Sequence, residues 1–182
     1  MSKYEEAIEE ISKLISDSKN IVDASHAKNT LHWLIIIRPD ADDILKIAAY
    51  AHDIERAMPD RLNKDDFDEY STYKLAHSKC SGVIASKIAL NVGYTPSEAE
   101  KVAHLIELAE FSSSDEDVQS ICDADSISFF DNNADEYLNK NGVKATKQKM
   151  NFMYSRASGI AKNKIVIILE KKKELDLLNI AK

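Results

Sequence analysis

The chain has 182 residues, of which 30% are charged, and a formal net charge of -7. This length allows one ordinary domain with a substantial core. An acidic chain without a dense stripe of lysine and arginine is not expected to bind a nucleic-acid polymer. Its cysteines, Cys80 and Cys122, lack CxxC spacing, and no basic, apolar leader opens the chain, so we expect a cytoplasmic protein. The longest apolar run, LHWLIII, is too short to cross a bilayer, so we expect no membrane partner.

Apolar residues recur at helical spacing along almost the whole chain, which contains only 4 glycines and 3 prolines. This pattern predicts an all-α, single-domain protein of about seven or eight helices spanning residues 1–182. Proline ends the second predicted helix, and the pair Thr95 and Pro96 caps the fifth. The predicted helices cover residues 4–15, about 24–37, 41–56, 70–91 and 95–111, the segment from SSSDED to Phe130, and a last helix from about 145 to beyond 169.

Two histidines lie on the buried faces of the second and third predicted helices. An advance of about 100° per residue places His26 among Trp33 and other apolar residues of its helix. The same phase places His52 on the apolar stripe of its helix, with Asp53 one step round. His32 points away from the buried face, and we expect it at the surface.

Asp125 occupies the apolar stripe of the sixth predicted helix, whereas Asp123 points about 140° away from the centre of that stripe. A buried carboxylate without a partner costs free energy, so Asp125 requires a cation. His26, His52, Asp53 and Asp125 are therefore predicted to project into one core as metal ligands. Two imidazoles and two carboxylates suit Mn, Fe, Co, Ni or Zn, with positions left for water.

A structural interpretation of each ligand remains open beside the metal-binding one. A single inward histidine such as His26 is more often a satisfied core residue than a ligand. The adjacent pair His52 and Asp53, combined with the inward Asp125, shifts the balance toward a metal site.

The order of these residues, with His26, then HD at 52 and 53, and then ADSI from Ala124 to Ile127, resembles the HD-domain superfamily of metal-dependent phosphohydrolases. The resemblance covers about residues 20–130 as an HD core. Residues 144–182 would form a C-terminal helical extension, in which KMNFMYSRASGIAK is similar to the MYxR helix of such proteins. The pacing of the whole chain, including RPDADDILKIAAYAHDIERAMP, also resembles the DUF4202-type group.

The resemblance implies one divalent ion held by the four ligands named above. Some HD families bind a second ion through two further histidines, and His77 lies inward where the first of these is expected. Ala109 stands at the second position, and nearby His104 lies on the opposite side of its helix. One ion is therefore favoured over two, with His77 as a residue behind the ligands or in contact with substrate.

The expected chemistry is hydrolysis of a phosphate ester by a metal-activated water, with Asp53 orienting that water. Fixed cations are then needed for the phosphate. Arg56 is the first candidate, although an ion pair with Glu55 or Asp60 is an equal alternative, and Lys74 can reach the mouth of the pocket. The remaining substrate-binding candidates are Arg61, Lys64 and Arg156.

The sequence thus favours a phosphohydrolase that acts on a small phosphorylated metabolite, plausibly a nucleotide. The acidic residue that some HD nucleotidases carry after the HD pair is replaced here by Arg56, with Glu55 one position earlier, which counts against transferring that activity directly. Two alternatives remain: a module that binds metal or a phosphorylated ligand without turnover, and a di-iron HD oxygenase. A homodimer is left open.

Overall fold

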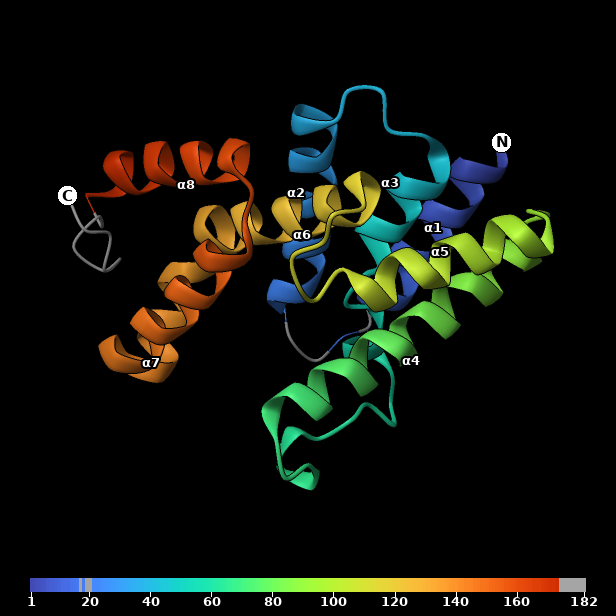
Figure 1. Ribbon diagram of the computed structural model, residues 1–182. Helices are drawn as coiled ribbons and strands as arrows, with labels where there is room; N and C mark the ends of the chain where they lie inside the picture. The colour runs from blue at the N-terminus through green and yellow to red at the C-terminus, as the bar shows by residue number, and fades with distance from the viewer. Residues whose placement is uncertain (17, 19–20, 174–182) are drawn as a thin grey trace.

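The computed structural model describes residues 1–16, 18 and 21–173. The described part is all-α, which confirms the predicted fold class, and it contains no strand. Two short 3-10 helices and one π-helical turn accompany eight α-helices (Figure 1). The elements are α1 (Lys3–Ser16), α2 (Ile21–Ile37), α3 (Asp43–Ala51), η1 (Ile54–Ala57), η2 (Lys64–Asp66), α4 (Tyr70–Asn91), α5 (Pro96–Leu108), α6 (Glu116–Ser128), η3 (Phe129–Asn133), α7 (Ala134–Arg156) and α8 (Gly159–Lys172).

Side-chain caps mark where several helices begin. Asp42 accepts a hydrogen bond from the Leu45 amide at the start of α3, and Asp115 accepts two from backbone amides at the start of α6. Thr95 and Glu98 form a capping box at α5, with proline at the first helical position, as the sequence predicts. These caps satisfy amides that have no partner inside the helix.

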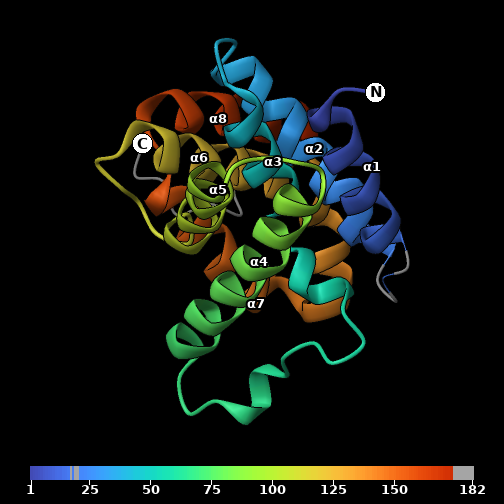
Figure 2. The same cartoon turned by 90° about the vertical axis from the view of Figure 1, so that its right-hand side faces the viewer.

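Helices α2 and α6 pack together in the middle of the molecule (Figure 1). Helices α1, α3, α4 and α5 gather on one side of this pair, and α7 and α8 lie on the other. After a quarter turn, the segment between α3 and α4 is seen to extend beyond the body of the protein (Figure 2). The centre therefore receives side chains from segments that are far apart in the sequence.

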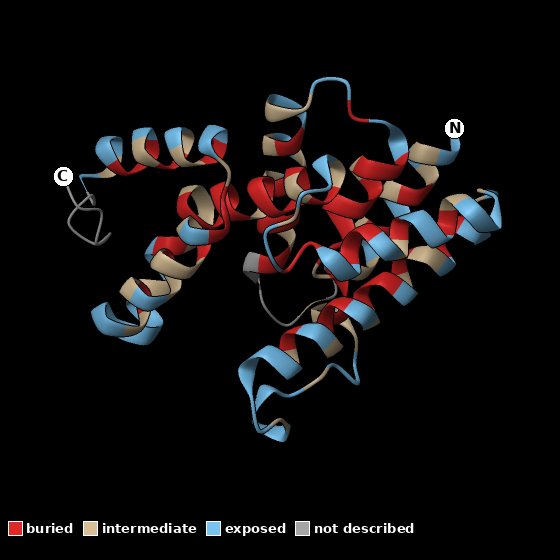
Figure 3. Ribbon diagram, in the orientation of Figure 1, coloured by how far each residue is buried: buried red, intermediate tan, exposed pale blue. Residues whose placement is uncertain are grey.

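The apolar core consists of two clusters. The larger draws on α1 to α6, and the smaller on the end of α6, η3, α7 and α8. Trp33 and Ile37 of α2 pack against both clusters. Buried residues concentrate along α3 and α6, while residues 59–69 before α4 and the far end of α7 are largely exposed (Figure 3). The predicted domain boundaries near 130 and 144 stay a prediction, and residues 174–182 of the predicted extension lie outside the described residues.

Helix α3 is shorter than the sequence predicts. The expected helix over 41–56 ends at Ala51, and the chain turns through His52 and Asp53 into η1. The carbonyl of Ala49, which in a continuing helix would accept the amide N–H four residues later, accepts instead the Nδ1–H of His52 at 2.9 Å. The side chain of His52 therefore helps to end the helix that carries it.

The predicted last helix is also two helices. The expected segment from about 145 to beyond 169 is interrupted between Arg156 and Gly159. Its first part belongs to α7, which begins earlier, at Ala134, and its second part is α8. Ser158 caps α8, and buried Asp123 accepts hydrogen bonds from the amide of Ser158 at 2.8 Å and from its hydroxyl. Asp123, which the helical phase predicts to point away from the metal site, therefore binds the start of α8.

No helix within residues 1–16 and 21–173 has the length and apolar character needed to traverse a membrane.

Candidate metal centre

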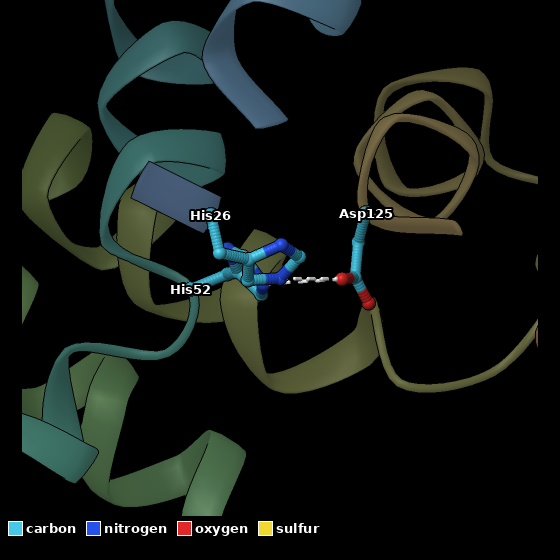
Figure 4. Close-up of side chains that lie close together, drawn as sticks. All are labelled: His26, His52 and Asp125. Atoms are coloured by element: carbon cyan, nitrogen blue, oxygen red, sulfur yellow. Dashed lines mark ion pairs between the residues drawn. The ribbon is translucent and has the colours of Figure 1, made fainter. Parts of the chain in front are cut away.

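Three helices bring the four predicted ligands together. His26 lies on α2, Asp125 on α6, and His52 with Asp53 at the turn after α3. The rings of His26 and His52 lie side by side and face the carboxylate of Asp125 (Figure 4). The Oδ1 atom of Asp125 is 3.0 Å from the Nε2 atom of His26 and 3.4 Å from that of His52. The Oδ2 atom of Asp53 is 3.8 Å and 3.6 Å from the same two nitrogens.

Hydrogen bonds fix how the two histidine rings present their nitrogens. The Ser128 hydroxyl donates to the carbonyl of His26, so its free lone pair accepts the Nδ1–H of the His26 ring at 2.9 Å. In the same way, His52 donates its Nδ1–H to the carbonyl of Ala49. In the neutral rings both Nε2 atoms then carry lone pairs directed at carboxylates. The Nε2 atom of His52 is buried and has no hydrogen-bond partner.

This arrangement meets the requirements of a divalent cation. Nitrogen lone pairs and carboxylate oxygens repel each other unless a proton or a cation lies between them. His26, His52 and Asp125 form a group whose ligand atoms all lie within 4.8 Å of one another. The second ring nitrogen of each histidine is held by a carbonyl or a hydroxyl, as in metal sites of proteins.

Arg56 holds the Asp53 carboxylate in place, with its guanidinium 2.9 Å from Oδ2. The structure therefore pairs Arg56 with Asp53 rather than with Glu55 or Asp60. Burial opposes ionisation of Asp53, but Arg56 and the neighbouring histidines outweigh it and keep the pKa of this carboxyl well below its usual value. Asp53 is therefore charged and available as a ligand near neutral pH.

Arg156 plays the corresponding part for Asp125. Its guanidinium contacts Oδ2 of Asp125 and also donates to the Ser126 hydroxyl at 3.1 Å and to the carbonyl of Glu110 at 3.0 Å. Arg156 is buried, so this cation belongs to the wall of the site and not to a solvated surface. Burial opposes the ionisation of Asp125, but Arg156 and His52 keep the pKa of Asp125 well below its usual value.

A second group of possible ligands consists of Asp53, His77 and Glu110. The Nε2 atom of His77 is 2.8 Å from Oδ1 of Asp53, whose other oxygen, Oδ2, faces His26 and His52 of the first group. Lys74 lies 2.7 Å from Glu110. The sequence has Ala109 where a second additional histidine is expected, and in the structure the neighbouring Glu110, just after α5, supplies a possible ligand instead.

The two groups differ in how far they are already satisfied. The second has an internal ion pair between Lys74 and Glu110 and a contact between His77 and Asp53. In the first, the Nε2 atom of His52 lies 3.4 Å from Asp125 but has no hydrogen-bond partner. This unsatisfied atom makes the first group the better candidate for an added cation.

Glu55 supports His77 from behind. Its Oε2 atom is 2.6 Å from the Nδ1 atom of His77, and its other oxygen accepts a hydrogen bond from the amide of Leu62. Glu55 is buried, and its own amide donates to Ser81 of α4 at 3.2 Å. This carboxylate thus connects the loop after η1 to the ligand group.

A cavity of about 390 Å³ opens onto the candidate ligands. Its size falls within the range of small-molecule sites in proteins. Tyrosine and phenylalanine side chains share its wall with charged groups. The lining residues are Asp23, His26, Asp53, Arg56, Lys64, Tyr70, Tyr73, Lys74, Glu110, Asp125, Phe129, Asn133, Glu136, Tyr137, Lys140, Asn141, Lys149, Met153 and Arg156.

Two predicted site residues lie elsewhere. Arg61 is exposed and does not line the cavity, because the loop after η1 directs it to solvent. His104 is exposed on α5 and belongs to neither ligand group within the described residues, so the structure gives it no role behind the ligands or at a second ion. His32 is exposed, as expected.

The sequence interpretation missed three residues of the site: Glu55, Glu110 and Lys149. Glu110 directly follows the apolar segment LIELA, and its position next to the inward-facing Ala109 could have predicted that it lies near the site. Glu55 was seen only as a partner for Arg56. Lys149 lies four residues before Met153 and seven before Arg156 on α7, and this helical spacing places all three on the face that lines the cavity.

Comparison with known proteins gives one match. The sequence profile of the domain of unknown function DUF4202 matches residues 6–174. No curated protein and no solved structure matches the chain. The match spans nearly the whole sequence, and the chain therefore belongs to the DUF4202 family.

Proposed function

We propose that this protein is a divalent-metal-dependent phosphohydrolase of the HD type, which hydrolyses a phosphate ester of a small metabolite, plausibly a nucleotide. One observation carries the proposal. The lone-pair atoms of His26 and His52 converge with the Asp125 carboxylate at a cavity lined by cationic side chains. The chemistry of this ligand set suits Mn, Fe, Co, Ni or Zn.

When bound by His26, His52, Asp53 and Asp125, a divalent ion would polarise a phosphoryl oxygen and lower the pKa of water. The side chains of the protein supply the remaining requirements. Arg56 fixes the position of one Asp53 oxygen, and the negative charge of the Asp53 carboxylate would orient the attacking water. Lys74 and Arg156 bring positive charge to the wall against which a phosphoryl group would rest.

The reaction consumes one water and releases inorganic phosphate. The oxygen of water forms a bond to phosphorus, the ester P–O bond breaks, and the departing alkoxide takes up a proton. The proton lost by water passes to solvent through the cavity, because Asp53, whose pKa lies well below its usual value, accepts a proton poorly. Arg56 and His77 hold the Asp53 carboxylate in the position from which it would orient the water.

A specific observation keeps one alternative in view. The cavity cations Arg56, Lys74 and Arg156 are already paired with carboxylates. A ligand-binding module without turnover has the same requirement for metal and phosphate contacts. Such a module differs from an enzyme only in the fate of the bound ester, so activity must be measured directly. The di-iron oxygenase alternative would show itself as iron bound at about two equivalents.

The test combines metal analysis with a hydrolysis screen. The purified protein is loaded separately with Mn, Co, Ni, Fe and Zn, and its metal content is measured by mass spectrometry. Phosphate release is then followed with nucleoside monophosphates and sugar phosphates. We expect about one tightly bound ion and metal-dependent release. The matched variants are His52→Ala, which removes a ligand, and His32→Ala, which removes an exposed histidine from α2.

The outcome separates the alternatives. Loss of metal and activity in His52→Ala, with both retained in His32→Ala, supports the phosphohydrolase. Metal binding without release of phosphate from any ester supports the binding module. If His52→Ala changes neither metal content nor activity, the proposed site is wrong.

A further inference from the structure

Among the described residues that line the cavity, one cation that is not exposed to solvent has no carboxylate partner. Six cationic and five acidic side chains line it. Arg56, Lys74 and Arg156 form ion pairs with Asp53, Glu110 and Asp125 respectively. Exposed Lys64 and Lys140 are at the rim and are hydrated by solvent.

Lys149 of α7 differs from the other five. Among the described residues, no carboxylate oxygen lies within 4.0 Å of its Nζ atom, and the side chain is partly buried. The Nζ atom lies 5.7 Å from the ring centre of Phe129 and 5.5 Å from that of Phe152. Aromatic faces attract a cation weakly and do not accept its three hydrogen bonds.

Positive charge dominates the electrostatic surroundings of Lys149. Burial and the positive charges of Lys74, Arg156 and Arg56 lower the pKa of Lys149 to about 7, and Asp125 offsets them only in part. These groups come from α4, α7, η1 and α6, the elements that surround the ammonium group. A negatively charged ligand would compensate the positive charge that these elements leave around Lys149.

We propose that Lys149 is the anion-recognition residue of the cavity and that its ammonium group binds a phosphoryl oxygen of the ligand on the α7 side of Asp125. The inference rests on the proposed function in one respect, namely that the ligand is phosphorylated. It does not require that the ligand be hydrolysed.

Charge favours a dianionic phosphate over a carboxylate. With a divalent ion bound and Lys149 protonated, the lining would have an excess of about three positive charges, counted from its ionisable side chains. A phosphomonoester carries about two negative charges near neutral pH. A monoanionic carboxylate would leave most of the excess uncompensated in a partly buried site.

The experiment measures binding of inorganic phosphate by calorimetry at pH 7.5, with the 182-residue protein in its metal-free and metal-loaded forms. Lys149→Met keeps the length and apolar stem of the side chain but removes its charge. We expect this variant to bind phosphate at least about tenfold more weakly, as for a lost charge-assisted hydrogen bond. The control is Lys162→Met, because Lys162 lies over the ring of Tyr154 at 5.5 Å and does not line the cavity.

A second readout follows the proton. Phosphate binding is repeated in two buffers that differ in ionisation enthalpy, which reports how many protons the complex takes up. We expect the wild type to take up a fraction of a proton more than Lys149→Arg, because arginine is already charged. Lys149→Arg should retain most of the affinity. A merely structural lysine would not produce this difference in proton uptake.

The possible results separate this inference from the proposed function. If Lys149→Met binds phosphate as tightly as the wild type, or if the wild type binds none, the inference is overturned even where hydrolysis occurs. If phosphate binding depends on Lys149 but no ester is hydrolysed in the metal screen, the inference stands and the phosphohydrolase proposal fails.

Discussion

The Nε2 atom of His26 and the Oδ1 atom of Asp125 lie 3.0 Å apart, although one belongs to α2 and the other to α6. The Ser128 hydroxyl accepts the Nδ1–H of the histidine ring and so directs the opposite nitrogen toward this oxygen. Arg156 contacts the other oxygen of Asp125. Both partners are thus oriented by neighbours, and the space between them requires a proton or a metal ion.

In the metal-free protein, His52 makes stability depend on pH. Burial disfavours the charged ring, but Asp53 and Asp125 outweigh it and raise the pKa of His52 from 6.5 to about 9. A raised pKa contributes stability that is fully present below pH 6.5 and is lost as the pH rises through about 9. In chelator-treated protein, the free energy of unfolding of the wild type relative to His52→Gln should therefore fall by about 3 kcal/mol between pH 6 and pH 10.

Urea unfolding at a series of pH values measures this difference, and comparison with His52→Gln cancels the titration of other groups. A saturating metal ion displaces the proton from His52, so the dependence should reverse, with tighter binding and higher stability at high pH. A constant difference between the two proteins across this range would contradict the raised pKa.

Arg156 should be one of the most important residues for stability. Its guanidinium is buried and contacts Asp125, Ser126 and the carbonyl of Glu110. Arg156→Met removes the cation but leaves the buried carboxylate, which typically costs about 3–5 kcal/mol. Urea unfolding of the metal-free protein measures the loss. Arg61→Met, at an exposed arginine, should change the free energy of unfolding by no more than about 0.5 kcal/mol.

Glu55 should restrain the loop between η1 and α4. The buried carboxylate accepts the Leu62 amide and contacts His77, so Glu55→Ala releases both. We expect trypsin to cleave after Arg61 or Lys64 at least about tenfold faster in this variant, because local opening then costs less free energy. Glu69→Ala, at an exposed residue of the same loop, should cleave at the wild-type rate. Equal rates in the two variants would show that Glu55 does not restrain the loop.

Much of the fold follows from helical periodicity, because apolar stripes and caps such as Thr95 act locally. The helix ends were less predictable. Helix α3 ends where the ring of His52 bonds the carbonyl of Ala49, an interaction that no propensity scale contains. The break before α8 depends on Asp123, which lies in α6 and bonds Ser158 across the fold. Tertiary contacts decided both.

The candidate site shows the same division. Helical phase brought His26, His52 and Asp125 together because each lies on the buried face of its own helix. Helical phase also placed Arg56 near His52, on the assumption that both lie on one helix. In the structure α3 ends before His52, and Arg56 stays near the site because it forms an ion pair with Asp53. Glu110 lies just after the end of α5, where helical phase no longer applies.

The contact between α4 and α5 should be sensitive to one methyl group at Gly82. A Cβ atom added there would lie 2.9 Å from the carbonyl oxygen of Ala103 and 3.2 Å from its Cα atom. Both are backbone atoms, so the two helices must separate. Overpacking of this kind costs about 1–3 kcal/mol, which offsets or exceeds the gain in helix propensity from alanine of about 1 kcal/mol. Gly82→Ala should therefore be less stable than the wild type.

The same displacement should reach the metal centre. Helix α4 carries His77 and Lys74, and α5 leads into Glu110, so a shift between them disturbs the ion pair of Lys74 with Glu110. Gly159→Ala is the matched control, because a Cβ atom at Gly159 meets nothing within 4 Å. Urea unfolding and metal titration of both variants measure the effect. Lower stability and weaker metal binding in Gly82→Ala, with neither change in Gly159→Ala, would show that close approach of these two helices maintains the site.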